Sequence, residues 1–397
     1  MTLLLVFAVT LVIAVLVSDI AENSILSTAI LFLVAGFLTG RGWLGAPPHL
    51  HGDLLQRMSE IALFSILFTD GIRTGGVRRI IETWHLPGRA LLIGMPLTIA
   101  GIALLAHYLL SASWIYSFLV AAVLSPTDPI FVSAIFRFEN IPYRVKSLLN
   151  VESGLNDGLA LPIVVLLLAR ISPNGSDVRI VTEELLLGIL IGIAVPWLSI
   201  RLEQTRFFKA AGLYEALNAF SIGLLVMAIC YSTGANLFLG AYAAGITIAS
   251  MGGSAARSFG KFGELIAELL KLSALLIFGA VIAPNFFAAL SAPDYAFIFL
   301  AVFAVRTPAI LLSLAGTELS FQEKLLAGWF GPKGFASVVY GILILQAGIT
   351  YLAHLVGLAV AASIFVYSST DILIGRRFEA HQESPASDSE EDVRPSD

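Results

Sequence analysis

Two short stretches place acidic side chains inside apolar segments of the chain. The first is Ser125-Pro126-Thr127-Asp128-Pro129, and the second is Glu152-Ser153-Gly154-Leu155-Asn156-Asp157-Gly158. A charged side chain in the middle of a bilayer costs at least about 2.5–3.5 kcal/mol. Three such acids within thirty residues, two of them beside helix-breaking residues, therefore predict a path for ions or protons.

The second stretch has helical spacing. Glu152 and Asn156 share one face of a helix, and Ser153 and Asp157 share the next. The oxygens of Asp157 and Ser153 are hard ligands that suit a small monovalent cation. A carboxyl group shielded from water favours its protonated form, whereas a bound cation favours the ionised form. One carboxylate at position 157 would then hold a proton or a cation by turns, which couples two opposed fluxes.

The first stretch predicts a broken helix. Pro126 and Pro129 each remove a backbone donor and clash with the preceding turn. Backbone groups freed inside a membrane need protein neighbours, water or ions as partners. We expect Asp128 to organise an ion site at this break, with Thr127 stabilising it. A proline kink with a capping aspartate is the alternative. Asn156 offers an amide that supports the break without titrating.

Two basic residues also lie inside apolar segments and need partners. Arg306 is expected to form a permanent, structural ion pair with Glu152, because a guanidinium group suits that role. Lys333 belongs to a second helix-breaking element, Gly331-Pro332-Lys333-Gly334. We expect it either to face the site near Asp128 and Asp157 or to cap the carbonyl groups of half-helices.

Two further charged residues are expected to have no direct role in transport. Asp70 ends an apolar run beside Gly71 and is expected at the membrane interface. Lys271 follows Glu264 and Glu268 at helical spacing, which is typical of a ladder of salt bridges at the membrane edge.

The chain that positions these residues is 397 residues long, 57% hydrophobic and only 13% charged. Soluble domains carry about 25% charged residues, so the composition indicates a polytopic membrane protein. The basic residues are dispersed between apolar runs, which argues against a nucleic-acid partner.

Thirteen runs have lengths suited to crossing a bilayer: 2–18, 25–40, 54–71, 90–110, 113–136, 146–170, 181–200, 213–231, 236–250, 262–283, 294–314, 322–346 and 350–373.

These runs predict an all-α fold with about 13 transmembrane helices, because lipid cannot satisfy the backbone of an open strand. The interruptions fall in the runs 113–136 and 322–346, which are seven spans apart. That separation predicts two inverted six-helix repeats joined by a linking seventh helix, each repeat holding one broken crossing helix.

The distribution of basic residues predicts the orientation. Fifteen lysines and arginines flank one face of the thirteen runs, and four (Arg41, Arg57, Arg170 and Arg179) flank the other. Basic residues favour the cytoplasmic side, so we expect a multi-pass protein of the cell (inner) membrane with its N-terminus outside. Residues 1–375 form the predicted membrane domain. Residues 376–397, rich in Ser, Asp, Glu and Pro near the end, predict a disordered acidic cytoplasmic tail.

At these motifs the chain resembles the monovalent cation:proton antiporters that include the sodium/proton exchangers, in the subgroup with an Asn-Asp pair. Thr127-Asp128-Pro129 resembles the motif on the family's first broken helix, and Asn156-Asp157 resembles its ion-binding pair. Phe303-Ala304-Val305-Arg306 resembles the segment whose arginine pairs with the glutamate. Gly331-Pro332-Lys333-Gly334 resembles the element on the second broken helix, with lysine in place of the usual arginine.

The resemblance implies a thirteen-helix fold, a core domain that moves against a dimerisation domain, and a homodimer. It also implies that Na⁺ or K⁺ binds at Asp157, with Thr127, Ser153 and Asp128 nearby. We therefore expect an antiporter, not an enzyme, that exchanges Na⁺ (or K⁺ or Li⁺) for H⁺ by alternating access and electroneutrally. A cation channel or uniporter that uses the same acids is the alternative. No cofactor is expected.

Overall fold

The computed structural model of the chain describes residues 2–18, 28–40, 52–128, 141–171, 177–205, 213–251, 254–281 and 290–382. These parts are helical and contain no strand. The predicted all-α fold class is therefore confirmed for the described residues.

The helices follow one another along the whole chain. Up to the first break they are α1 (Thr2–Leu16), α3 (Thr28–Thr39), α4 (Gly52–Arg73), α5 (Gly76–Thr83), α6 (His85–Arg89), the π-helical turn η1 (Ala90–Gly94), α7 (Met95–Leu109) and α8 (Trp114–Leu124). After it come α10 (Tyr143–Ile171), α11 (Val178–Glu203), α12 (Leu213–Thr233), α13 (Leu237–Met251), α14 (Ser254–Val281), α16 (Ala292–Phe299), the π-helical turn η4 (Leu300–Ala304), α17 (Arg306–Ser313), α18 (Phe321–Trp329), α19 (Phe335–Gln346) and α20 (Thr350–Gln382).

Several of these helices are long and apolar enough to cross a bilayer. Within the described residues they are His85–Leu109, Tyr143–Ile171, Val178–Glu203, Ala292–Ser313 and Thr350–Tyr367, and shorter apolar helices accompany them. The chain is thus a multi-pass membrane protein. The count of thirteen spans and the inverted repeats stay predictions.

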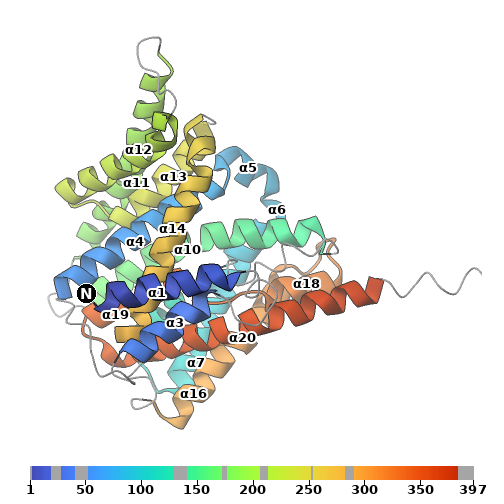
Figure 1. The fold of residues 1–397 in the computed structure, drawn as a ribbon. Helices are drawn as coiled ribbons and strands as arrows, with labels where there is room; N and C mark the ends of the chain where they lie inside the picture. Colours follow the sequence, from blue (N-terminus) through green and yellow to red (C-terminus); the bar gives the residue numbers. More distant parts are fainter. Residues whose placement is uncertain are drawn as a thin grey trace, which may run out of the picture.

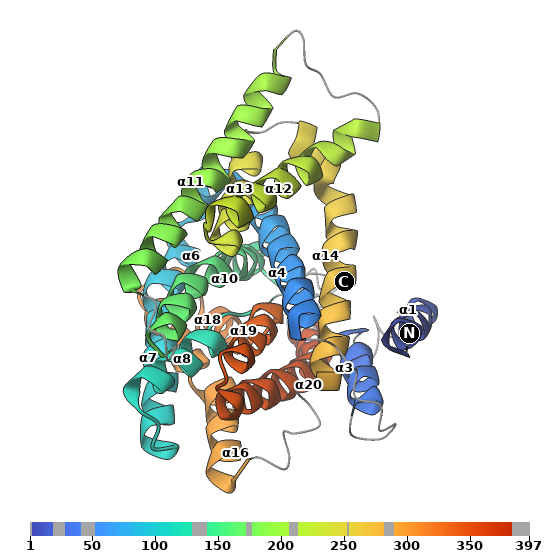
Figure 2. The ribbon, with the colours of Figure 1, turned by 90° about the vertical axis from the view of Figure 1, so that its left-hand side faces the viewer.

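Helix α4 lies at the centre of the arrangement. It packs against α13 and α14 and also contacts α10 and α19. Figure 2 shows α4, α10 and α19 together in the middle of the molecule, with α1 and α3 outside α14. Side chains on α4 can therefore meet groups from several helices.

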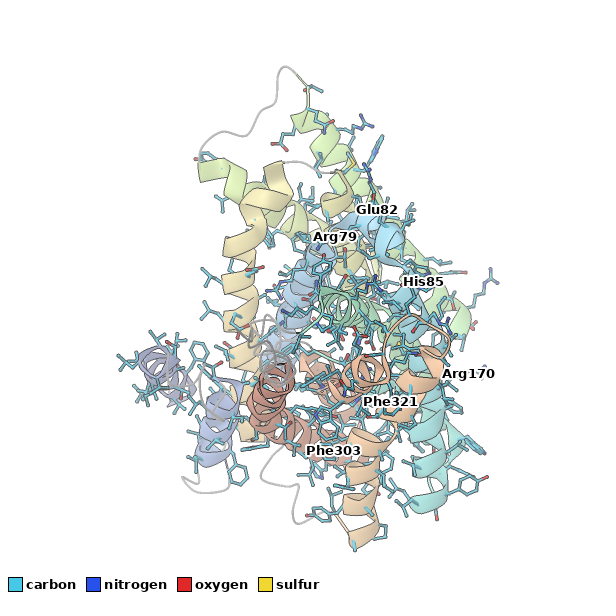
Figure 3. The ribbon with its side chains drawn as sticks, turned by 90° about the vertical axis from the view of Figure 1, so that its right-hand side faces the viewer. Arg79, Glu82, His85, Arg170, Phe303 and Phe321 are labelled. Atoms are coloured by element: carbon cyan, nitrogen blue, oxygen red, sulfur yellow. The ribbon has the colours of Figure 1, made fainter. Side chains whose placement is uncertain are left out.

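The short helices α5 and α6 mark one end of the molecule, together with α18 and the C-terminal end of α20 (Figure 1). Figure 3 looks onto that end, where Arg79, Glu82 and His85 lie on α5 and α6, and Phe321 begins α18. The predicted orientation puts these connections on one common side. That this side faces the cytoplasm stays a prediction.

Both predicted interruptions begin where the sequence places them. Helix α8 ends at Leu124, and Ser125 to Asp128 are not helical, while Pro129 lies outside the described residues. Helices α18 and α19 are separated by the non-helical residues 330–334. At both interruptions the backbone N–H and carbonyl groups lose their partners within a helix and need others. The residues that supply these partners form the candidate site.

The division between membrane domain and tail at residue 375 stays a prediction. Helix α20 continues seven residues beyond it, to Gln382. Residues 376–382 contain no glycine or proline, and Pro385 is the first residue that would break the helix. Helix propensity therefore carries the last span past the end of its apolar run. The rest of the predicted tail lies outside the described residues.

Candidate functional site

The two interruptions touch and satisfy each other's backbone. The Asp128 N–H donates a hydrogen bond to the Pro332 carbonyl at 3.0 Å. The Phe335 N–H, in the first turn of α19, points to Oδ2 of Asp128 at 3.5 Å. The Ser337 hydroxyl donates to the Val123 carbonyl, near the end of α8, at 2.7 Å. The Asp128 carboxylate thus faces the positive N-terminal end of α19, a position that favours its charge.

Glycines in the second interruption allow this close approach. A Cβ atom at Gly334 would lie 2.0 Å from the Cβ of Asp128, and one at Gly331 would lie 2.0 Å from Nε of Arg306. Gly334 has a φ of -103°, which any residue can adopt. The requirement for glycine at this position is therefore steric.

We expect the Gly334→Ala variant to be destabilised, because overpacking a tight contact costs roughly 1–3 kcal/mol. The apparent Tm in detergent should fall. The matched control is Gly154→Ala in α10, where the nearest atom to an added Cβ is a Thr74 methyl at 3.7 Å. This control should keep or raise the Tm, since alanine favours a helix interior over glycine. Equal Tm values for the two variants would contradict the steric argument.

Helix α10 supports the first interruption with two polar side chains. The Ser153 hydroxyl donates to the Thr127 carbonyl at 2.5 Å. The Asn156 amide donates to the Thr127 hydroxyl at 2.9 Å and points to the Thr127 carbonyl at 3.4 Å. The structure thus brings Thr127, Ser153 and Asn156 together. Asn156 occupies the supporting position that its neutral amide predicts.

A small cavity of about 30 Å³ lies beside this group. It is lined by Asp70, Arg73, Thr74, Asp128, Asn150, Ser153, Gly154 and Asp157. A cavity needs only about 10–15 Å³ to hold one water molecule, so this one has room for water or a dehydrated alkali cation. Carboxylates from α4, α10 and the first interruption surround it. The hydroxyl of Tyr340 on α19 donates to the Asp157 carbonyl at 2.9 Å and ties α10 to the second broken helix.

The position of Asp70 at the membrane interface stays a prediction, but its place at the cavity was not predicted from the sequence. Its side chain is 16% exposed and lines the cavity together with Asp128 and Asp157. Arg73 lies one turn further along α4, and its guanidinium is 3.9 Å from the Asp70 carboxylate. One pattern in the sequence could have indicated this role for Asp70: an acid, a base and a hydroxyl residue, Asp70, Arg73 and Thr74, follow one another within about one helical turn.

Arg306 and Glu152 form a buried ion pair. The two terminal nitrogens of Arg306 donate to the two carboxylate oxygens of Glu152 at 2.8 and 2.9 Å. Both side chains are 4% exposed or less. The π-helical turn η4 ends just before Arg306, and such turns occur often at functional sites. This two-pronged geometry is the strong form of an arginine–carboxylate contact.

Lys333 lies beside this pair and not at either expected place. Its side chain is fully buried, and its ammonium group has no hydrogen-bond partner within the described residues. The charges that act on it most strongly are those of Arg306 and Glu152. Its backbone N–H donates to the Ser363 hydroxyl of α20 at 2.7 Å.

The interpretation of Lys271 as part of a salt-bridge ladder at the membrane edge is also wrong. Lys271 is only 6% exposed. Glu264, on the same face of α14, is paired instead with Arg73 of α4 at 3.4 Å. This face of α14 therefore also meets charged groups across the helix packing, on α4.

Comparison with known proteins gives a consistent family. The family model described as "Sodium/hydrogen exchanger, transmembrane" matches residues 6–374. The K⁺/H⁺ antiporter NhaP2 of Shewanella sp. (strain ANA-3) is 23% identical over 344 residues, which cover 85% of this chain and 59% of that protein. The K⁺/H⁺ antiporter NhaP of Alkalimonas amylolytica is 24% identical over 354 residues, covering 87% and 61%. This chain thus spans about three fifths of the length of these relatives.

A solved structure has the same fold. The sodium proton antiporter MjNhaP1 from Methanocaldococcus jannaschii, solved at pH 8, superimposes with a TM-score of 0.74 over 96% of each chain. The sequences are 17% identical, so this likeness concerns the fold alone.

Proposed function

Because the chain belongs to the sodium/hydrogen exchanger family of monovalent cation:proton antiporters, we propose that it exchanges a monovalent cation for H⁺ across the cell membrane by alternating access. The observation that carries the proposal is the cavity between α4, α10 and the first interruption, with three carboxylates around a space of about 30 Å³. Ionised carboxylates gathered around one small space repel one another, and a bound cation or proton offsets that repulsion.

Asp157 is the shared site in this proposal. A cation in the cavity is held by the Asp157 carboxylate, with Ser153, Thr127 and Asp128 as neighbouring oxygen donors, and Asn156 keeps the interruption in place. A proton on Asp157 removes the negative charge that holds the cation. The two ligands therefore exclude each other. Since one carboxylate changes its occupant, one cation moves for one proton and the exchange is electroneutral.

Na⁺ is the proposed cation, with K⁺ and Li⁺ as alternatives. The names of the relatives include both potassium and sodium. The ion pair of Glu152 with Arg306 serves the structure of the core in this proposal. We also propose that the protein is a homodimer and that its C-terminus lies in the cytoplasm.

Purified protein in proteoliposomes tests the function. Vesicles loaded with Na⁺, K⁺ or Li⁺ and diluted into a cation-free buffer should acidify inside as the cation leaves, and a trapped pH dye reports the change. The proton must move uphill at the expense of the cation gradient, at a rate independent of an imposed membrane potential. Single-channel currents without uphill proton movement would overturn the proposal in favour of a channel or uniporter.

A further inference from the structure

A line of charged residues runs along the contact between α14 and α4. Glu264, Glu268 and Lys271 recur at helical spacing on α14, which packs along α4. The outer member, Glu264, is 50% exposed and lies 3.4 Å from Nε of Arg73. Arg73 in turn lies 3.9 Å from Asp70, at the cavity. The line therefore leads from an exposed end to the candidate site.

Lys271 is the buried end of this line. It is only 6% exposed and lies seven residues, about two helical turns, beyond Glu264 on α14, which packs along the helix that carries Asp70. The three acids around the cavity, Asp128, Asp70 and Asp157, are near enough to interact with its charge. Yet no described carboxylate lies within 4.0 Å of its ammonium group, so it forms no closed ion pair in the described parts of the chain.

The charged groups that act on Lys271 come from three segments. Helix α4 contributes Asp70 and Arg73, the first interruption contributes Asp128, and Glu268 lies one turn earlier on α14 itself. An empty cavity among three carboxylates is stabilised by a nearby fixed positive charge. An incoming alkali cation meets the same positive charge as repulsion. Because the ammonium group stands back from the acids, it weakens cation binding without blocking it.

We propose that Lys271 is a fixed counter-cation of the transport site, which stabilises the empty site and sets the apparent affinity for the transported cation. This inference rests on the proposed function. It makes Lys271 a positioning and affinity-setting residue that acts through Asp128 and Asp70 and does not touch the cation.

The test is cation binding by isothermal titration calorimetry to purified, monodisperse full-length protein. Alkaline pH is chosen because protons compete least there. The Lys271→Met variant, which keeps the aliphatic stem, should bind Na⁺ at least about fivefold more tightly than the unaltered chain. Lys271→Arg, which keeps the charge, should stay within about twofold of it. The matched control is Lys324→Met, because Lys324 donates to the Thr317 carbonyl and neither residue lines the cavity.

Transport provides an independent readout. Tighter binding lowers KM for Na⁺ in the Lys271→Met variant and slows cation release, so kcat should fall as well. A residue with only a structural role would lower the amount of folded protein and leave KM unchanged. Should Lys271→Met fold poorly, Lys271→Gln serves the same titration.

The same titrations distinguish a failure of the role of Lys271 from a failure of the proposed function. Unchanged or weaker Na⁺ binding in both neutral variants, with Asp157→Asn abolishing binding, would overturn the role of Lys271 and leave the proposed function intact. Full Na⁺ binding in Asp157→Asn would overturn the proposed function itself.

Discussion

The Asp157→Asn variant is expected to lose all cation-driven proton movement while it keeps its fold. Asparagine has nearly the same shape but neither titrates nor offers a negative charge, so it can hold neither the proton nor the cation. The contact of Asp157 with α19 survives, because Tyr340 donates to the backbone carbonyl of residue 157 and not to its side chain. Dye-loaded proteoliposomes measure the loss, and the apparent Tm reports the fold.

The control is an exposed acid away from the cavity. Glu82 on α5 is 59% exposed and pairs with Arg78 one turn away. The Glu82→Gln variant should therefore exchange cations for protons like the unaltered chain. Exchange by Asp157→Asn above a small residual rate would rule out position 157 as the shared site.

The second large effect concerns the buried ion pair, and it should be unequal for the two partners. Breaking a buried pair costs about 3–5 kcal/mol, because it leaves one charge uncompensated. The Arg306→Gln variant leaves Glu152 with the positive charge of Lys333 nearby, a replacement partner whose ammonium group has no other hydrogen bond in the described residues. The Glu152→Gln variant leaves the guanidinium group of Arg306, which stays charged, buried without its carboxylate and beside a second basic residue, Lys333.

We therefore expect Glu152→Gln to lower the apparent Tm more than Arg306→Gln does. The double variant should lose less stability than the sum of the two single losses, because it leaves no unpaired member of the original pair. Intrinsic tryptophan fluorescence during heating in detergent measures all three. A larger loss in Arg306→Gln would show that Lys333 does not compensate Glu152.

The sequence predicted the two interruptions because helix-breaking residues act locally. The paired prolines Pro126 and Pro129, and Pro332 between two glycines, concentrate helix-breaking residues within a few positions. The single prolines Pro162 and Pro196, by contrast, lie inside α10 and α11.

The pairing of Glu152 with Arg306 was predictable for a related reason. Two opposite charges inside apolar runs each need a partner, and few partners exist in a chain with 13% charged residues.

The place of Asp70 at the cavity and the burial of Lys271 were missed because they depend on helix packing. Each residue was interpreted from neighbours on its own helix, whereas further charged groups lie across the contact of α4 with α14 and at the first interruption. A signal for Lys271 was present, however. It lies nine residues into the predicted run 262–283, about 13 Å deep at 1.5 Å per residue, which is too far for a lysine at the membrane edge.

The glycines of the second interruption illustrate the same limit. Their number and spacing predicted a break in the helix. They did not predict that Gly334 makes room for Asp128, or that Gly331 makes room for Arg306. Such requirements arise only when two distant segments approach each other. Lys333 likewise followed from the break as a buried cation, but its place beside Arg306 and Glu152 depended on how α19 packs.

Proton release on cation binding is the most direct test of a carboxylate that holds a proton or a cation by turns. Na⁺ is added to purified protein in weakly buffered solution at a pH where Asp157 is protonated, and a dye counts the protons released. The predicted result is about one proton per bound cation, and none from the Asp157→Asn variant. Cation binding without proton release, or equal release from the variant, would contradict a shared site at Asp157.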